Sequence, residues 1–287
     1  MEAAIRNRTI AWSQIALLAA ASAAPSPVVA AELKPEAAQG YARYLQLTEA
    51  RMKPEVAPGG VFLAVDGLPA PQRGDAQSRL ERGEVVTWRL RTADPTGDDR
   101  TPGALIHHWV GTIFVPMASL RQVLALLQDY DHHDAYFRPD VVKSKTIAHT
   151  GDNFKIYYRL KRKKVITVVL DTEYDVHYHP IDASRAFSES HATRIAEVEH
   201  AGESDERELP PGNDGGYLWR LDSYWRFADT GRGVYVQCEA VSLTRDIPAG
   251  LNWLIGPFVE SIPRESLAFT LESARNALLR GISRGSN

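Results

Sequence analysis

The sequence has little cysteine, little excess charge and few of the motifs that mark well-known enzymes. Its 287 residues include one cysteine, Cys238, which excludes an intramolecular disulfide and any CxxC metal site. The formal net charge is −3. Proteins that bind nucleic acid normally have a strongly basic surface, so we expect no nucleic-acid partner. The sequence also lacks the motifs of phosphate loops, dinucleotide sites, zinc hydrolases and nucleophilic serines. We therefore expect no cofactor, no metal and no recognisable catalytic residues.

The N-terminus has the order of features that is typical of a secretory signal peptide. Arg6 and Arg8 form a basic segment, and an Ala-rich apolar run follows at 16–31 with small residues up to Ala31. Two prolines interrupt this run, which is too short to span a bilayer of about 30 Å. We predict that residues 1–31 are a cleaved signal peptide and that the mature, soluble protein is periplasmic or secreted. The alternative is an uncleaved anchor or a disordered tail.

Local patterns after the signal peptide predict an N-terminal extension and a main domain. The extension covers residues 32–103 and the main domain covers 104–281. Within the extension we expect helices at 34–53 and 72–83, strands at 61–66 and 84–90, and a polar loop at 92–103.

The main domain reads as a strand, a helix, a series of strands and a final helix. We expect the strands at 104–115, 140–149, 153–161, 164–179, 184–199, 216–229 and 233–246. Strands that follow one another through short turns pair antiparallel. One face of such a sheet must be covered, and the last helix, from about Pro263 to Arg280, is the only long element available. These patterns predict an α+β fold in which a curved antiparallel sheet wraps around a long C-terminal helix.

Two stretches and this element order resemble the helix-grip superfamily of START, polyketide-cyclase-like and coenzyme Q-binding proteins, also called SRPBCC. The stretch 126–147 is similar to the passage in which the first helix ends and the meander begins, and 235–248 is similar to the last strand. The residues that match the first passage are Asp129, Tyr136, Phe137, Pro139, Val142 and Ser144. The resemblance implies a helix-grip fold over about 104–281 and an enclosed apolar ligand of the lipid, sterol or quinone class. A minority of the superfamily are cyclases or hydrolases, and fold alone does not choose among these functions.

The segment DYDHHDAYF, residues 129–137, is dense in carboxylates and imidazoles and raises the question of a metal or acid–base site. We interpret it as a helix C-terminus, where His132 and His133 complement the helix dipole while Tyr136 and Phe137 turn into the core. No third ligand lies at a metal-site spacing, so we expect no metal here.

Two further pairs of histidines are candidates for metal binding. His177 and His179 share one face of a strand, but HxH without a third ligand favours a solvated strand face over a metal site. His107 and His108 point to opposite faces of their strand, and one of them could enter the cavity.

The strand at 216–229 separates charged from aromatic side chains. One face carries Arg220, Asp222, Tyr224 and Arg226, and the other carries Trp219, Leu221, Ser223, Trp225 and Phe227. The aromatic face is favoured as the cavity wall. The charged face is expected to meet solvent through pairs such as Arg226–Glu239, or else one pair orients a polar group of the ligand. The predicted ligand-binding residues are Trp219, Trp225, Phe227, Arg245, Trp253, Phe258, Leu267 and Leu271.

Two segments suggest how a ligand could be loaded. The basic run 159–164 is either a solvated turn or a contact for an anionic membrane surface. The apolar stretch 251–258 is either core or a movable lip that precedes the last helix. The predicted membrane-contact residues are Lys161, Arg162, Lys163 and Lys164.

The sequence thus favours an exported START-like protein that binds an apolar or amphipathic small molecule and is not an enzyme. The first alternative is a cyclase- or hydrolase-like enzyme that uses dispersed polar residues of the cavity. The second is an interaction module whose core is filled, with the extension contacting a partner. The size and lining of the cavity separate these three functions.

Overall fold

The computed structural model describes residues 31–96, 101–164, 166–247 and 252–285, with backbone alone for 252–260 and 284–285. The predicted signal peptide therefore lies outside the described residues except for its last position. No helix among the described residues is both long enough and apolar enough to cross a bilayer.

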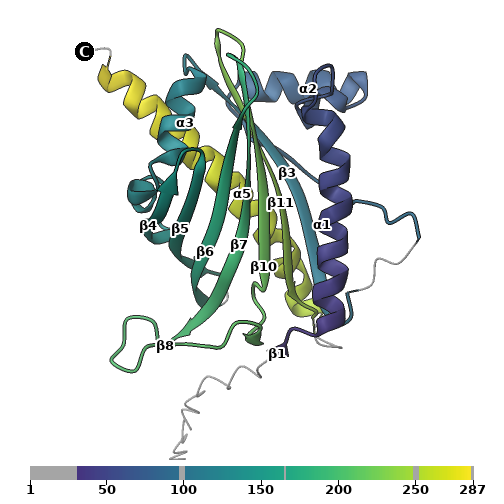
Figure 1. The fold of residues 1–287 in the computed structure, drawn as a ribbon, viewed down its shortest axis with the longest axis vertical. Coiled ribbons are helices and arrows are strands. Elements are labelled where there is room, and N and C mark those ends of the chain that lie inside the picture. Colours follow the sequence, from purple (N-terminus) through teal and green to yellow (C-terminus); the bar gives the residue numbers. More distant parts are fainter. Residues whose placement is uncertain (1–30, 97–100, 165, 248–251, 286–287) are drawn as a thin grey trace, which may run out of the picture.

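The elements follow the predicted order closely (Figure 1). The first third of the chain forms β1 (Ala31–Glu32), α1 (Pro35–Val56), the 3-10 helix η1 (Ala64–Gly67), α2 (Ala70–Glu81) and β2 (Val86–Arg89). The central part forms β3 (Ala104–Pro116), α3 (Leu120–Gln128), the 3-10 helix η2 (Tyr130–His132), α4 (His133–Tyr136), β4 (Val141–Thr150), β5 (Asn153–Lys163), β6 (Thr167–Pro180) and β7 (Arg185–Glu199). The remainder forms β8 (Arg207–Glu208), β9 (Asn213–Asp214), β10 (Arg220–Asp229), β11 (Gly233–Arg245) and α5 (Asn252–Gly285).

The long strands form one antiparallel sheet. Its order is β2-β3-β11-β10-β7-β6-β5-β4, so most strands lie beside a strand that is next to them in the chain. Helix α5 crosses this sheet diagonally in Figure 1. The predicted α+β helix-grip fold is confirmed. We call the sheet face toward α5 the inner face and the opposite face the outer face.

Helix α5 is longer than predicted but buries the predicted stripe. It begins at Asn252 and continues through two prolines, whereas the sequence suggested a start at Pro263, a residue favoured in a first turn. Gly111 of β3 permits a close approach, because a Cβ there would lie 2.8 Å from Leu271 Cδ1. The stripe that packs into the core consists of Leu267, Leu271, Ala274 and Leu278, all at most 6% exposed.

Helix α1 covers part of the outer face, which the sequence did not predict. Pro35 stands in its first turn, where a missing N–H costs nothing, and its buried residues recur at helical spacing. Those residues are Ala37, Tyr41, Tyr44, Thr48 and Met52. The expectation that the last helix is the only cover for the sheet was therefore wrong, because a second helix packs on the other face.

The rest of the extension also joins the sheet. Strand β2 pairs with β3 at one edge, and η1 and α2 pack there through Phe62, Leu63, Val65 and Leu80. The expected strand at 61–66 was wrong, since a short apolar run cannot by itself distinguish a strand from another buried segment.

Candidate ligand cavity

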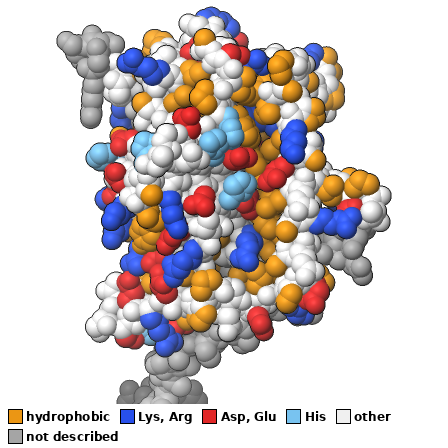
Figure 2. All heavy atoms as spheres, in the orientation of Figure 1, with side chains coloured by type: hydrophobic (Ala, Val, Ile, Leu, Met, Phe, Trp, Pro, Cys, Tyr) orange, Lys and Arg blue, Asp and Glu red, His pale blue; other side chains and the backbone are white. Residues whose placement is uncertain are grey.

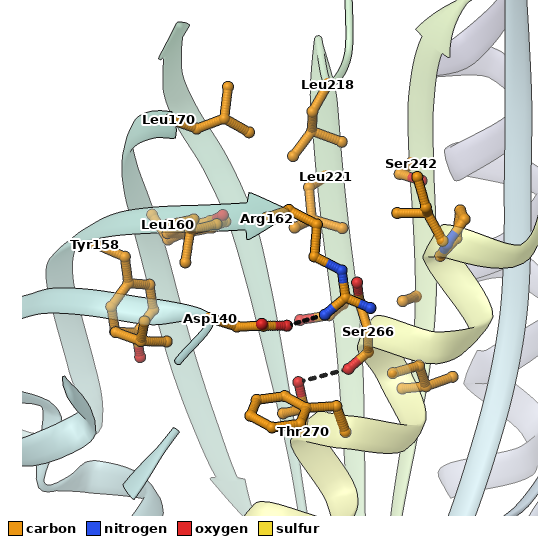
Figure 3. Close-up of a pocket in the computed structure, with 18 of the residues that line it drawn as sticks. Asp140, Tyr158, Leu160, Arg162, Leu170, Leu218, Leu221, Ser242, Ser266 and Thr270 are labelled. Carbon is orange, nitrogen blue, oxygen red and sulfur yellow. Dashed lines mark hydrogen bonds and ion pairs between the residues drawn. The ribbon is translucent and has the colours of Figure 1, made fainter. Parts of the chain in front are cut away.

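A large cavity lies between the inner face and α5. Its volume is about 870 Å³, which falls within the range of about 300–1,000 Å³ for small-molecule sites. Figure 3 shows side chains from the sheet and from α5 projecting into it. The apolar part of the wall includes Trp109, Leu160, Val168, Leu170, Tyr174, Leu218, Leu221, Trp225, Ala240, Ile262, Leu267 and Phe269. The fold is therefore hollow between sheet and helix, so a filled core does not describe this protein.

Strand alternation supplies the sheet wall. On β10, Leu221, Ser223 and Trp225 face the cavity, while Asp222 and Tyr224 face outward. On β11 the same alternation places Cys238, Ala240 and Ser242 on the wall. Burial raises the pKa of the Cys238 thiol, which keeps it protonated and a poor nucleophile.

A hydrogen-bonded imidazole and phenol form one end of the cavity. His133 Nε2 donates to the Leu126 carbonyl at 3.2 Å, which leaves Nδ1 to accept from Tyr158 Oη at 2.6 Å. Both residues line the cavity, and the two rings stack with centroids 5.8 Å apart. Burial lowers the pKa of His133 to about 4, so the ring is neutral at pH 7.

A pair of tyrosines continues this polar end. The hydroxyls of Tyr130 and Tyr178 lie 2.8 Å apart, and Tyr178 donates to the Leu127 carbonyl at 3.2 Å. Burial raises the pKa of Tyr130 far above its ordinary value, so its phenol stays neutral. The phenol oxygens of these groups can therefore accept a hydrogen bond from a hydroxyl group of a ligand without adding net charge.

The cavity reaches the surface beside β5 and α5. Exposed Lys161 and Ile166 both contribute to its lining. Arg162 points toward Asp140 in Figure 3, and the two form an ion pair. Glu265 of α5 joins this group through Lys164 at 2.5 Å, and the Lys164 hydrogen bond holds the pKa of Glu265 below its usual value.

The structure brings together only part of the predicted ligand-binding set. Trp225, Arg245 and Leu267 line the cavity. Leu271 and Phe227 are fully buried in the core that adjoins it. These five residues therefore lie either on the cavity wall or in the core beside it.

Of the remaining predicted residues, Trp219 lies away from the cavity, and the side chains of Trp253 and Phe258 are outside the described part of the structure. Trp219 precedes β10 and packs beside Ala37 and Tyr41 beneath α1, with its Nε1 donating to Asp214 at 3.0 Å. Its assignment to the cavity wall was based on strand alternation, which does not hold before the strand begins. The backbone of Trp253 and Phe258 is helical, so the predicted lip at 251–258 belongs to α5 from Asn252 onward rather than to a separate loop.

The basic run 159–164 is more than a solvated turn. Arg159 forms ion pairs with Asp171 at 2.7 Å and Glu206 at 2.9 Å, besides the pairs of Arg162 and Lys164 described above. Lys161 and Lys163 are exposed, and no ion pair is found for either within the described part of the chain.

Most of the segment DYDHHDAYF forms a helix exit as predicted, but His133 has a different role. His132 is exposed and pairs with Asp129 at 2.7 Å, and Phe137 is buried, as the helix-exit interpretation expected. His133 does not complement a helix dipole in solvent but is 4% exposed and lines the cavity. The sequence analysis did not predict this role. The one signal in the sequence is that His133 stands between Tyr130 and Phe137, which are both buried.

The other histidines are distributed over both faces. His107 and His108 do point to opposite faces: His107 lies 3.0 Å from Thr244 Oγ1 of the cavity wall, whereas His108 contacts Glu239 at 2.7 Å on the outer face. His177 and His179 lie beside Asn153 and Glu189 respectively, and both are partly exposed.

Among the described residues, one group of ionisable side chains is close enough to share an ion. It consists of His200, Glu203 and Asp205 in an exposed turn. No buried polar group accompanies it, so it gives no reason to assign a metal.

The charged face of β10 is buried at Asp222, Tyr224 and Arg226 rather than solvated, and only Arg220 at its start is exposed. Arg226 and Glu239 are each 1% exposed, but they do not pair with each other as the sequence suggested. Arg226 binds Glu55 of α1 at 2.6 Å, and Glu239 binds Arg51 of α1 and His108. Burial alone would raise the pKa of Glu239, but the His108 hydrogen bond and nearby arginines lower it. The predicted solvent exposure of this face was wrong because α1 covers it.

Comparison with known proteins gives matches among solved structures alone. No protein-family model and no curated protein matches the sequence. The fold is similar to a STAR-related lipid transfer protein from Xanthomonas axonopodis (18% identity, 67% of this chain and 98% of that chain, TM-score 0.43). It is also similar to human STARD10 (13%, 72% and 80%, TM-score 0.44) and to the Zhui aromatase/cyclase from a Streptomyces species (11%, 62% and 96%, TM-score 0.42). The likeness is one of fold.

Proposed function

We propose that this protein binds an apolar or amphipathic small molecule, of the lipid, sterol or quinone class, in the cavity between the sheet and α5. The observation that carries this proposal is the cavity of about 870 Å³, whose wall is mostly apolar and aromatic. Neutral hydroxyl and imidazole groups at one end suit an uncharged polar group of the ligand. No step of binding needs a metal or a nucleotide cofactor.

The test is ligand binding with a variant that fills the cavity. Ala240 lies on the sheet wall, so Ala240→Phe should narrow the cavity from within. Native mass spectrometry and fluorescence of 1-anilinonaphthalene-8-sulfonate should show one bound molecule per wild-type chain and a loss of at least tenfold in affinity for the variant. Ala50→Phe on the exposed side of α1 is the control and should bind normally. If the wild type carries no extracted ligand and does not bind the dye, the proposal is wrong.

A second candidate function is acid–base catalysis in the same cavity. The observation that favours it is the Tyr158–His133 hydrogen bond, which holds a phenol proton beside a neutral imidazole. Hydrolysis of 4-nitrophenyl butyrate provides a simple assay. A rate above buffer that is lost in Tyr158→Phe, a variant that keeps the ring, would favour the enzyme. For a binding protein we expect no such rate in the wild type.

We further propose that Lys161 and Lys163 meet an anionic membrane surface next to the cavity opening. Each free basic side chain contributes about 1 kcal/mol near such a surface. Arg162 and Lys164 contribute less than the sequence suggested, because Asp140 and Glu265 offset their charge. Lys161→Gln/Lys163→Gln should therefore weaken sedimentation with phosphatidylserine vesicles by roughly 30-fold. Lys145→Gln, at an exposed position on β4, is the control, and equal binding by all three proteins would contradict the proposal.

We propose, finally, that the protein acts outside the cytoplasm after loss of residues 1–31. The support is the basic, apolar and small-residue order of the N-terminus. Intact-mass measurement of protein from the periplasm or medium should give a chain that begins near Glu32, and a chain that begins at Met1 would contradict this.

A further inference from the structure

A row of serine hydroxyls crosses the sheet wall of the cavity. Ser188 and Ser190 of β7, Ser223 of β10 and Ser242 of β11 all line the cavity, and we call these residues the serine row. Ser190 and Ser223 are paired directly across strands, and Ser242 is paired with Leu221, two residues from Ser223. Neighbouring members of the row are therefore on the order of 5–8 Å apart, the spacing of paired, alternate and diagonal positions in a sheet.

The hydroxyl groups of the serine row have no hydrogen-bond partner within the described residues, although their backbones are paired in the sheet. Other hydroxyls near the cavity do find one: Thr172 donates to the Tyr158 carbonyl at 3.1 Å, and Thr270 donates to the Ser266 carbonyl at 2.9 Å. Ser188 and Ser242 are 1% and 7% exposed, so any partner for them must come from inside the cavity. A ligand that fills this space becomes that partner or leaves the hydroxyls unpaired.

The two outcomes differ in free energy. A buried hydroxyl that loses water without gaining a partner is unfavourable, whereas a matched oxygen atom restores the hydrogen bond. A saturated acyl chain has no oxygen along its length and would leave the whole row unpaired. A ligand with oxygen atoms along one edge would satisfy the row and leave its other edge for Leu160 and Leu170 on β5 and β6.

The remaining walls favour a rigid ring system. Trp109, Tyr174 and Trp225 present aromatic surface to the cavity, and the sheet fixes the Cβ atoms from which the serine hydroxyls project. A rigid molecule presents its oxygen atoms at fixed spacing and loses little conformational entropy on binding, unlike a flexible chain.

We propose that the serine row recognises a ring-based ligand with two or more hydroxyl or carbonyl oxygens along one edge, in preference to a saturated acyl lipid. This proposal rests on the proposed function, because it assigns the ligand class of the same cavity.

The experiment uses two molecules with one skeleton. 5α-Androstan-17-one carries one oxygen, and 5α-androstane-3,11,17-trione carries three. A plain apolar cavity prefers the less polar molecule, because added carbonyls are better solvated in water. The serine row should make the trione bind more tightly than the mono-ketone. In competition with 1-anilinonaphthalene-8-sulfonate we expect the trione to bind about tenfold tighter, as two additional modest hydrogen bonds would produce.

Serine variants test whether the row causes this preference. Ser190→Ala/Ser223→Ala should abolish the advantage of the trione while leaving or improving the affinity of the mono-ketone. Ser283→Ala, at an exposed position on α5, is the matched control and should keep the wild-type order. A merely structural role of the serines would weaken both ligands alike and would overturn the proposal.

The remaining outcomes separate this proposal from the proposed function. If the dye binds but the mono-ketone displaces it as well as or better than the trione, the oxygen-recognition proposal is wrong and the binding function stands. The same conclusion holds if the dye binds and neither ketone displaces it. If the wild type does not bind the dye and carries no extracted ligand, the binding function itself is wrong.

Discussion

Both faces of the sheet carry buried polar side chains, but those of the outer face are paired within the protein and the serine hydroxyls of the inner face are not. On the outer face, α1 reaches across to the strands, and Glu55 and Arg51 bind Arg226 and Glu239. On the inner face, the serine row faces open space with no partner within the described residues. Figure 2, in the orientation of Figure 1, shows acidic, basic and histidine side chains mixed on the surface of the molecule. We call the buried ion pairs of Arg226 and Glu239 with α1 the outer-face network.

The difference shows which polar residues support the fold and which are available for binding. A buried polar group that is paired within the protein holds one arrangement of the chain, and breaking the pair is costly. A polar group that faces an unfilled cavity contributes little to stability and can bind something else. The outer face is therefore a structural interface, and the inner face is the candidate site.

The largest expected loss of stability comes from a charged substitution in the core beside the cavity. Leu271 is fully buried against β3, so Leu271→Asp would bury an unpaired carboxylate and remove apolar contacts. We expect a loss of at least about 4 kcal/mol in the free energy of unfolding. Thermal denaturation checks this, with Glu272→Gln, one residue away and exposed, as the control. An unchanged melting temperature would mean that this stripe of α5 faces water.

The outer-face network is tested by removing a buried charge from β10. Arg226→Met deletes the partner of Glu55 and of the Phe62 carbonyl, and we expect a loss of about 3 kcal/mol in the free energy of unfolding. Ligand binding at the inner face should be unaffected in the folded fraction. Arg220→Met, at an exposed position of the same strand face, should change stability by less than about 0.5 kcal/mol. Equal effects of the two substitutions would show that the network does not stabilise the fold.

His133 at the cavity and His191 on the outer face should respond to pH in opposite directions. Burial lowers the pKa of His133 from 6.5 to about 4, so the unfolded chain binds more protons than the folded one between these values. The contribution of His133 is fully present above pH 6.5 and is lost as the pH falls to about 4, by up to about 3 kcal/mol. On the outer face, hydrogen bonding to Asp222 raises the pKa of His191, so its contribution is present below pH 6.5 and is lost as the pH rises.

Urea denaturation at several pH values measures this contrast. His133→Phe should flatten the decline in stability between pH 6.5 and pH 4, although His107, whose pKa burial also lowers to about 4, will retain part of it. His191→Gln should instead flatten the decline above pH 6.5. A His133→Phe profile parallel to that of the wild type would contradict the burial of a neutral His133 at the cavity.

The smallest effect is expected from two neighbouring residues on opposite faces. Tyr224→Phe removes the hydrogen bond to Glu49 at 2.7 Å and should cost about 1 kcal/mol of unfolding free energy. Ser223→Ala removes an unpaired hydroxyl and should leave the free energy of unfolding unchanged or slightly higher. Differential scanning calorimetry measures the free energy of unfolding of both variants. A larger loss for Ser223→Ala than for Tyr224→Phe would show that the Ser223 hydroxyl is paired within the fold.

The sequence by itself determined the elements and most of their order. Alternation on β10 correctly separated Asp222, Tyr224 and Arg226 from Leu221, Ser223 and Trp225, because the period of a strand is a local property. The same local reasoning located the buried stripe of α5. It failed where no local pattern exists, at the 3-10 helix η1, at Trp219 before β10 begins, and at the first turns of α5.

Only the tertiary structure decided which elements cover each face of the sheet. Glu55 and Arg226 are 171 residues apart, and no feature of either segment alone indicates that they bind. The sequence predicts that His133 lies at a helix end, but the packing of α4 against β5 buries it at the cavity. A cavity has no sequence pattern of its own, because it is space that the side chains of distant strands and a helix leave unfilled.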